Sequence, residues 1–174
     1  SSQEDNGFFG PKIDRKFEEG LQRTNSRDWW PRMVVLKVMQ QYYSATRDVR
    51  IIKFLTNYFR YQLETLPNTP LGRWTFWAEQ RGGDNLLIVY WLYNITGDEF
   101  LLELGDLIHR QTVDWTNIFL EKDHLFRQNS LHCVNLAHGF KAPIVYYQKS
   151  RDSTHIKAVH HALNVIRNTF GFPT

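Results

Sequence analysis

The chain has 174 residues, enough for one domain with a hydrophobic core, and its apolar (42%) and charged (22%) fractions are ordinary for a globular protein. A net charge of +3, with no cluster of five or more Lys and Arg residues, argues against a nucleic-acid partner. The single cysteine, Cys133, excludes an intrachain disulfide and a multi-cysteine metal site, and no apolar run approaches the length of a membrane span.

Residues 1–26 form a lead-in, in which the helical period of residues 13–21 predicts one short helix. From residue 27 onward, apolar residues recur at helical spacing and predict three pairs of helices: 31–43 with 48–65, 84–93 with 98–119, and 130–147 with 152–170. We therefore interpret residues 1–174 as a single helical domain, with hairpins at 27–66, 84–120 and 130–170.

One turn pattern, Y-x-x-[ST]-[GR]-D, joins the two helices of each pair. Its copies begin at Tyr43, Tyr93 and Tyr147, which are 50 and 54 residues apart. Glycine at the fifth position suits a left-handed residue that ends a helix, whereas arginine there implies some strain or a different turn. The aspartate, or the Ser or Thr two residues before it, is expected to cap the next helix. Three copies of one turn indicate stacked αα-hairpins.

Hairpins of about 50 residues that must pack on one another are typical of an α/α toroid. The first helix of each pair is rich in apolar and small residues, as in an inner ring, and the second carries more charge. We therefore expect an all-α fold that is part, about the N-terminal half, of an (α/α)6 toroid. Such a half would expose an apolar flank, through which copies of the chain could self-associate.

The segments that connect successive hairpins are long and lead into the first turn of an inner helix, where ligands commonly bind. Aromatic rings beside Asp, Asn, Arg and His suit a sugar, because the ring faces stack and the polar groups bind hydroxyls. The candidate sugar-binding residues in and beside these segments are Trp29, Trp30, Trp74, Trp77, Arg81, Asp84, Asn85, His132 and Asn135.

The same residues also have structural interpretations. A histidine in the first turn of an inner helix, such as His132, can bind a hydroxyl or act as an acid or base, although a lone His is more often structural. We interpret His138 as a packing residue and His160 and His161 as solvent-exposed. Trp29 and Trp30 could instead be hydrophobic staples, and Trp74 and Trp77 could fill the core. Asp84 and Ser130 could be helix caps only, and Arg81 could form a structural ion pair with Asp84.

Three stretches carry a family resemblance: residues 28–43, residues 74–98 and, as the most specific, H-x-V-N-x-A-x-G-x-K-x-P at residues 132–143. They resemble the N-terminal part of a β-L-arabinofuranosidase-type glycoside hydrolase, of glycoside hydrolase family 127 and its relatives. The resemblance covers nearly the whole chain from about residue 27. It implies an α/α toroid followed by β-sandwich domains, a carbohydrate substrate, and a periplasmic or secreted location in a bacterium.

The resemblance also implies that His132 contacts the sugar, and that a zinc-bound cysteine nucleophile and a glutamate acid/base follow in the full-length parent. No matching Glu-Leu-Cys-like stretch is present, and Cys133 lies in a different motif. We therefore expect no catalytic and no metal-binding residue in this chain, zinc only in the parent beyond Thr174, and no activity of the chain alone. The better-known relatives carry His where this chain has residues 28–30 and 82–85, which leaves the sugar open.

An alternative from a different class is a stand-alone helical hairpin or solenoid domain that binds a saccharide or a protein partner. A catalytic Glu and Cys cluster in the parent protein distinguishes the enzyme from this alternative.

Overall fold

The computed structural model describes residues 3–12, 26–121 and 132–171. Within these ranges the regular structure is helical, and the one β-type pairing is an isolated bridge between Gln3 and Phe9. The all-α fold expected from the sequence is confirmed. The helix expected at residues 13–21 and the cap expected at Ser130 lie outside the described residues. None of the helices in the described ranges is long and apolar enough to cross a membrane.

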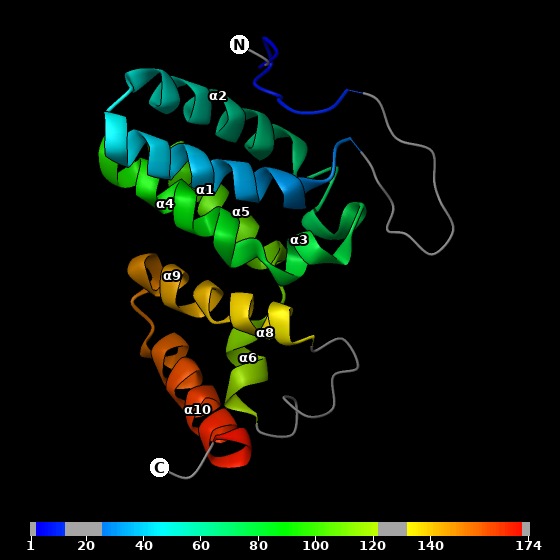
Figure 1. Cartoon of the computed structure of the whole chain (residues 1–174), viewed down its shortest axis with the longest axis vertical. Coiled ribbons are helices and arrows are strands. Elements are labelled where there is room, and N and C mark those ends of the chain that lie inside the picture. The colour runs from blue at the N-terminus through cyan, green and yellow to red at the C-terminus, as the bar shows by residue number, and fades with distance from the viewer. Residues whose placement is uncertain (1–2, 13–25, 122–131, 172–174) are drawn as a thin grey trace.

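The helices form three successive hairpins. The first is α1 (Trp29–Thr46) with α2 (Val49–Thr65), the second is α4 (Gly82–Thr96) with α5 (Phe100–Gln111), and the third is α8 (Cys133–Gly139) and α9 (Lys141–Ser150) with α10 (Ser153–Phe170). The connections contain η1 (Leu71–Arg73), α3 (Phe76–Gln80) and α6 (Trp115–Leu120). In Figure 1, α1, α4 and α9 follow one another, and α4 contacts both of its neighbours. Since α2 and α5 also contact each other, the first two hairpins stack in two rows, as in part of an α/α toroid, whereas α10 of the third packs on α6 and α9.

The three repeated turns have the same backbone geometry. The N–H of the fifth residue donates to the tyrosine carbonyl at 2.8–3.0 Å, and that residue is left-handed in every copy, with φ of 58° at Arg47, 73° at Gly97 and 57° at Arg151. The Ser or Thr hydroxyl accepts from the aspartate N–H at 3.2–3.3 Å. The local pattern therefore encodes one helix-ending turn three times.

The aspartate cap is present in two of the three copies. Asp48 accepts from the N–H of Arg50, and Asp152 accepts from the N–H of Thr154. The prediction is wrong for Asp98, because α5 begins two residues later at Phe100 and has no side-chain cap.

The helix expected over residues 98–119 is broken, which corrects the sequence prediction. Thr112 is extended, the N–H of Val113 donates to the carbonyl of Glu79 at 3.1 Å, and Asp114 caps a new helix, α6. A side chain at Gly82 would collide with the Thr112 hydroxyl, so this glycine allows the broken segment to lie against α4. As a result α5 stays with the second hairpin, whereas α6 packs on α10 of the third.

The helix expected over residues 130–147 is also interrupted, at Phe140 between α8 and α9. Pro143 explains this interruption, because proline has no N–H to donate to the carbonyl of Gly139 and its ring crowds that carbonyl.

Two hydrophobic clusters hold the fold together. The first core lies among α1, α2, α4 and α5 and includes Trp29, Leu36, Leu55, Phe59 and Leu104, all at most 2% exposed. The second core lies among α6, α9 and α10 and consists of the buried residues Trp115, Ile118, Phe119, Ala142, Ala158, Val159 and Ala162. The two cores meet where α4 crosses α9, and there Gly83 faces the backbone of Ala142.

One face of α1 exposes apolar side chains, with Val34, Val35, Val38 and Tyr42 between 38% and 58% exposed. An apolar flank of this kind was expected for part of a toroid, and self-association through it stays a prediction.

Candidate functional site

Asp84 is the centre of a charged cluster between α4 and the third hairpin. Its Oδ2 lies 2.5 Å from Nδ1 of His138, and its Oδ1 accepts a hydrogen bond from Nζ of Lys141. The Asp84 side chain is 13% exposed, whereas the side chains of His138 and Lys141 are 27% and 46% exposed, so the carboxylate is largely covered and its partners reach the surface. Because α4 has no side-chain cap, Asp84 is not the helix cap that its sequence position also allowed.

Arg81 and Trp30 extend the cluster along the same boundary. The Arg81 guanidinium lies 4.3 Å from the Trp30 ring centroid and 5.5 Å from that of Trp77, while its Nε donates to Asn135 Oδ1 at 3.0 Å. The His138 ring meets the Trp30 ring edge-on at 5.6 Å. We use the name Asp84 cluster for Trp30, Arg81, Asp84, Asn135, His138 and Lys141.

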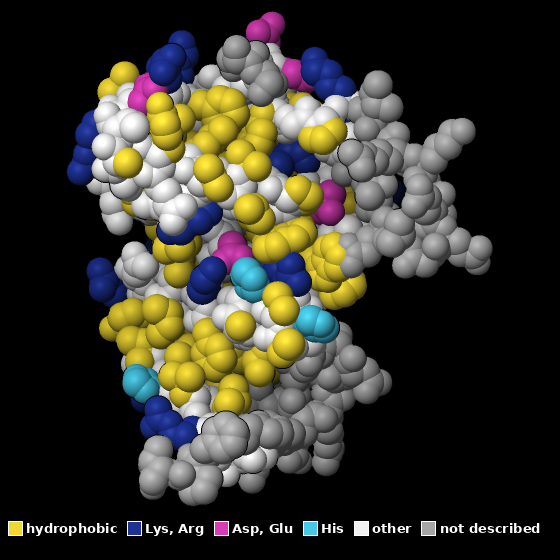
Figure 2. Space-filling model, in the orientation of Figure 1, with side chains coloured by type: hydrophobic (Ala, Val, Ile, Leu, Met, Phe, Trp, Pro, Cys, Tyr) yellow, Lys and Arg dark blue, Asp and Glu magenta, His cyan; other side chains and the backbone are white. Residues whose placement is uncertain are grey.

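Local sequence explains how these groups come together. The glycine pair at the start of α4 allows close packing, because a Cβ at Gly83 would lie 2.6 Å from the Ala142 nitrogen. The Asp84 carboxylate occupies the first turn of α4, where the helix dipole favours a negative charge. Figure 2 shows basic, acidic and histidine side chains gathered in the middle of one face, between the upper hairpins and the third.

The Arg81 guanidinium is fixed in place by its electrostatic environment and its ring contacts. Burial lowers the pKa of Arg81, and the nearby Asp84 carboxylate opposes that shift. Even so, a guanidinium stays charged near neutral pH, and its contacts with two indole rings and one amide hold it in one orientation.

Other candidates from the sequence lie elsewhere. Trp29 is buried in the first core and donates its indole N–H to the carbonyl of Thr69. Asn85 is fully buried, and its side-chain amide has no hydrogen-bond partner among the described residues. Trp74 is half-buried, and Arg73 lies over its ring. Its indole N–H is likewise unpaired within the described ranges. Trp77 lies beside Arg81 at the edge of the cluster.

His132 lies at the exposed start of α8. Its Nδ1 accepts the N–H of Val134 at 3.2 Å, so the residue is the N-cap of this helix rather than part of its first turn. This hydrogen bond leaves Nε2 for a ligand. Cys133 follows as the first residue of α8 and is an exposed free thiol.

Sequence reasoning missed His138 and Lys141. His138 was interpreted as a packing residue, but its ring binds Asp84. Asn135, His138 and Lys141 recur every three residues in the most specific motif, a spacing that can place side chains on adjoining parts of a helix surface. This spacing was the available signal.

The interpretation of His161 as solvent-exposed is also wrong. Its Nδ1 lies 2.7 Å from the carbonyl of Phe119, to which it donates, and this bond fixes α10 against α6. His160 is exposed, as expected.

The cluster has the chemistry to bind hydroxyl groups, because it combines a carboxylate, an imidazole, an ammonium group and a guanidinium beside an indole ring. It does not have the chemistry of a metal site. In residues 3–12, 26–121 and 132–171, no group of three or more His, Cys, Asp or Glu side chains could hold a metal ion. The described residues therefore do not fit the zinc that the resemblance assigns to the parent enzyme.

The stacked hairpins form a helical scaffold that carries the polar and aromatic Asp84 cluster. Comparison with protein families identifies the scaffold: the β-L-arabinofuranosidase family, GH127 catalytic domain, matches residues 1–174. The chain belongs to this family, which confirms the resemblance found in the sequence. No curated protein and no solved structure matches the chain.

Proposed function

We propose that this chain supplies part of the sugar-binding surface of a glycoside hydrolase, and that the Asp84 cluster binds the hydroxyl groups of a β-L-arabinofuranosyl unit. The observation that carries the proposal is the Asp84 carboxylate, held between His138 and Lys141 beside an Arg81–Trp30 pair. Family membership supplies the carbohydrate class of the ligand.

Each group has a distinct part in binding. The carboxylate of Asp84 accepts from a sugar hydroxyl, and Lys141, whose side chain is 46% exposed, donates to another. Trp30 offers an apolar face to the furanose C–H groups. His132 contributes its Nε2 at the start of α8. Because Arg81 is held by Asn135, we assign it the role of orienting the Trp30 ring rather than of moving during binding.

We further propose that the chain alone binds the sugar without cleaving it. Its single thiol, Cys133, is exposed at the start of α8 and lies outside the nucleophile motif that the family resemblance implies. The glutamate acid/base and the zinc-bound nucleophile are then supplied by residues outside these 174.

The binding proposal is tested by calorimetric titration of the chain with methyl β-L-arabinofuranoside. Asp84→Asn removes the charge that strengthens the hydrogen bonds of the site, so we expect affinity to fall about tenfold or more. Asp106→Asn is the matched control, since Asp106 also pairs with a lysine, Lys149, and a ring, Tyr146, but away from the cluster. Equal affinity in wild type and Asp84→Asn contradicts the proposal.

The inactivity proposal is tested with an aryl β-L-arabinofuranoside whose released phenol is measured by absorbance. We expect no release above the uncatalysed rate. Rapid release that is lost in Cys133→Ala would instead identify Cys133 as a nucleophile and overturn the proposal.

A further inference from the structure

A second hollow lies at the junction of α5, α6 and α10, and none of its lining residues belongs to the Asp84 cluster. Its volume is about 450 Å³, which is within the range of about 300–1,000 Å³ that is usual for small-ligand sites. Its polar lining comes from the end of α5, the break before α6 and the first turns of α6 and α10. The polar residues are His109, Arg110, Thr112, Asp114, Thr116, Asn117 and His155.

The two imidazole rings of the hollow are fixed by their own contacts. His109 stacks on Tyr146 with ring centroids 3.5 Å apart and an angle of 9° between the planes. His155 stands edge-on to that stack, 5.8 Å from His109, and its Nδ1 is 2.7 Å from the Thr116 hydroxyl. The polar groups are therefore oriented without a ligand, which lowers the entropy cost of binding.

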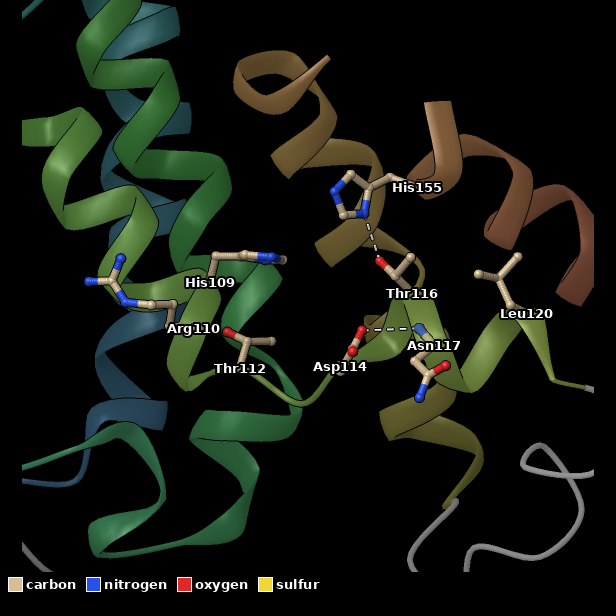
Figure 3. A pocket seen from close by; sticks show the side chains of 8 residues that line it. All are labelled: His109, Arg110, Thr112, Asp114, Thr116, Asn117, Leu120 and His155. Atoms are coloured by element: carbon tan, nitrogen blue, oxygen red, sulfur yellow. Dashed lines mark hydrogen bonds between the residues drawn. The ribbon is translucent and has the colours of Figure 1, made fainter. Parts of the chain in front are cut away.

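The hollow carries little net charge toward a ligand. Burial, assisted by the neighbouring His155, lowers the pKa of His109, so this ring is neutral near pH 7 and has one donor and one acceptor nitrogen. Asp114 already uses one carboxylate oxygen to cap α6. In Figure 3 the Arg110 side chain extends away from the others, whereas His109 extends toward α6.

This set of groups matches a neutral molecule with several hydroxyls better than an anion. Hydroxyl, amide and neutral imidazole groups both donate and accept, as sugar hydroxyls do, and the Leu120 side chain provides an apolar edge for C–H groups. Arg110 and Asp114 both line the hollow, so the positive charge of the guanidinium is opposed by a carboxylate and an anion is not favoured there.

We propose that this hollow is a second glycan site, which binds a neutral saccharide unit apart from the Asp84 cluster. The choice of a saccharide over another neutral polyol rests on the proposed function, whereas the position of the site rests only on the α5–α6–α10 geometry. A glycan held at two places on one chain gains affinity from the linkage between its units.

The test is a titration of the whole chain with a β-L-arabinofuranosyl disaccharide, followed by NMR of the histidine Cε1–H signals assigned by substitution. We expect the signals of His109 and His155 to shift with the disaccharide but not with inorganic phosphate. Asn117→Trp fills the hollow from an exposed position on α6 and is expected to abolish these shifts. Thr116→Val removes the hydroxyl next to His155 and should weaken the affinity about three- to tenfold.

Two further variants separate this site from the first. Arg110→Ala should leave the shifts unchanged, and a loss of binding in that variant, or shifts with phosphate alone, overturns the neutral-ligand proposal. In Asp84→Asn, the His109 and His155 shifts should persist.

If the disaccharide shifts His138 only, the second site is refuted and the proposed function stands. If it shifts no histidine, both fail, and if it shifts only His109 and His155, the Asp84 site fails alone.

Discussion

The two cores of this chain are built from different side chains. The first core packs large aliphatic and aromatic residues from both helices of two hairpins, together with Phe9 from the lead-in and Val145 from α9. The second core has three alanines among its seven buried residues, and its bulk comes from Trp115 and Phe119. Each core also contains one deeply buried tryptophan whose indole N–H donates to a backbone carbonyl, Trp29 to Thr69 and Trp115 to Gln80.

The difference shows how stability is distributed along the stack. In the first core many large side chains share the burial, so no single one closes the interface. In the second core small residues allow α6, α9 and α10 to approach closely, and Trp115 lies flat against Gly139 of α8. We infer that the third hairpin depends on a few aromatic side chains, and that it can lose its packing while the first two hairpins keep theirs.

The largest expected effect is that of Trp115→Ala. Loss of this ring leaves a cavity and removes the hydrogen bond to the carbonyl of Gln80, at a cost of about 3–5 kcal/mol. Because the ring belongs to the second core, native-state hydrogen exchange should show lost protection in α6, α9 and α10 and little change in α1, α2 and α5.

Trp29→Ala is the matched control, since the ring is equally buried and equally hydrogen-bonded but lies in the first core. We expect it to weaken protection throughout the chain, because the third hairpin packs on α4. Uniform loss of protection in Trp115→Ala would show that the two cores unfold as one unit.

The next effect is expected at Gly83, where the two cores meet. Gly83→Ala places a Cβ 2.6 Å from the nitrogen and 2.9 Å from the Cα of Ala142, so α9 must move away from α4. Overpacking of this kind costs about 1–3 kcal/mol. Helix propensity alone predicts the opposite sign, because alanine is favoured over glycine within a helix by up to about 1 kcal/mol.

Denaturant unfolding of Gly83→Ala decides between these signs. A raised midpoint would mean that the α4–α9 crossing is looser than its geometry indicates. The loss of sugar affinity in this variant should exceed that in Trp29→Ala, since a shift of α9 carries Lys141 away from Asp84.

The elements that the sequence predicted well depend on local patterns. The three hairpins and their left-handed turns follow from residues within six positions of one another, so the Y-x-x-[ST]-[GR]-D pattern was sufficient. The break at residues 112–114 is different, because it is fixed by Glu79 and Gly82, about 30 residues earlier in the chain. The interruption at Phe140 could have been predicted from Pro143, but the apolar residues continue at helical spacing through this region and indicated one unbroken helix.

The candidate site divides in the same way. Arg81, Asp84 and Asn135 were chosen from residue type and position, and the fold places them at one boundary. The contacts of His138 and Lys141 with Asp84 could not be predicted from local sequence, because they depend on the crossing of α4 with α8 and α9. His138 and Lys141 follow Asp84 by 54 and 57 positions in the chain. Trp29 and Asn85 stand next to the cluster residues Trp30 and Asp84 in sequence, yet helical geometry turns both inward.

The smallest expected effect concerns the two arginines that hold left-handed turns, one in each region. Arg47→Gly and Arg151→Gly relieve a backbone strain of roughly 1–2 kcal/mol, which the greater flexibility of glycine in the unfolded chain offsets in part. We expect a net stabilisation between a few tenths and about 1 kcal/mol. Arg47 also lies over the Tyr43 ring at 5.7 Å, and Arg47→Gly removes this cation–π interaction, so the gain at Arg151 should be larger.

Thermal unfolding, read with hydrogen exchange in α10 and α2, measures both gains. If the cores unfold separately, Arg151→Gly should raise protection in α6, α9 and α10 only, and Arg47→Gly should act on the helices of the first core. Gly97→Ala tests the opposite change, from glycine to a residue with a side chain, in the second of the three turns. A Cβ at Gly97 meets nothing within 4 Å, so this substitution adds only backbone strain. A gain in stability from Gly97→Ala would contradict the strain on which the arginine predictions rest.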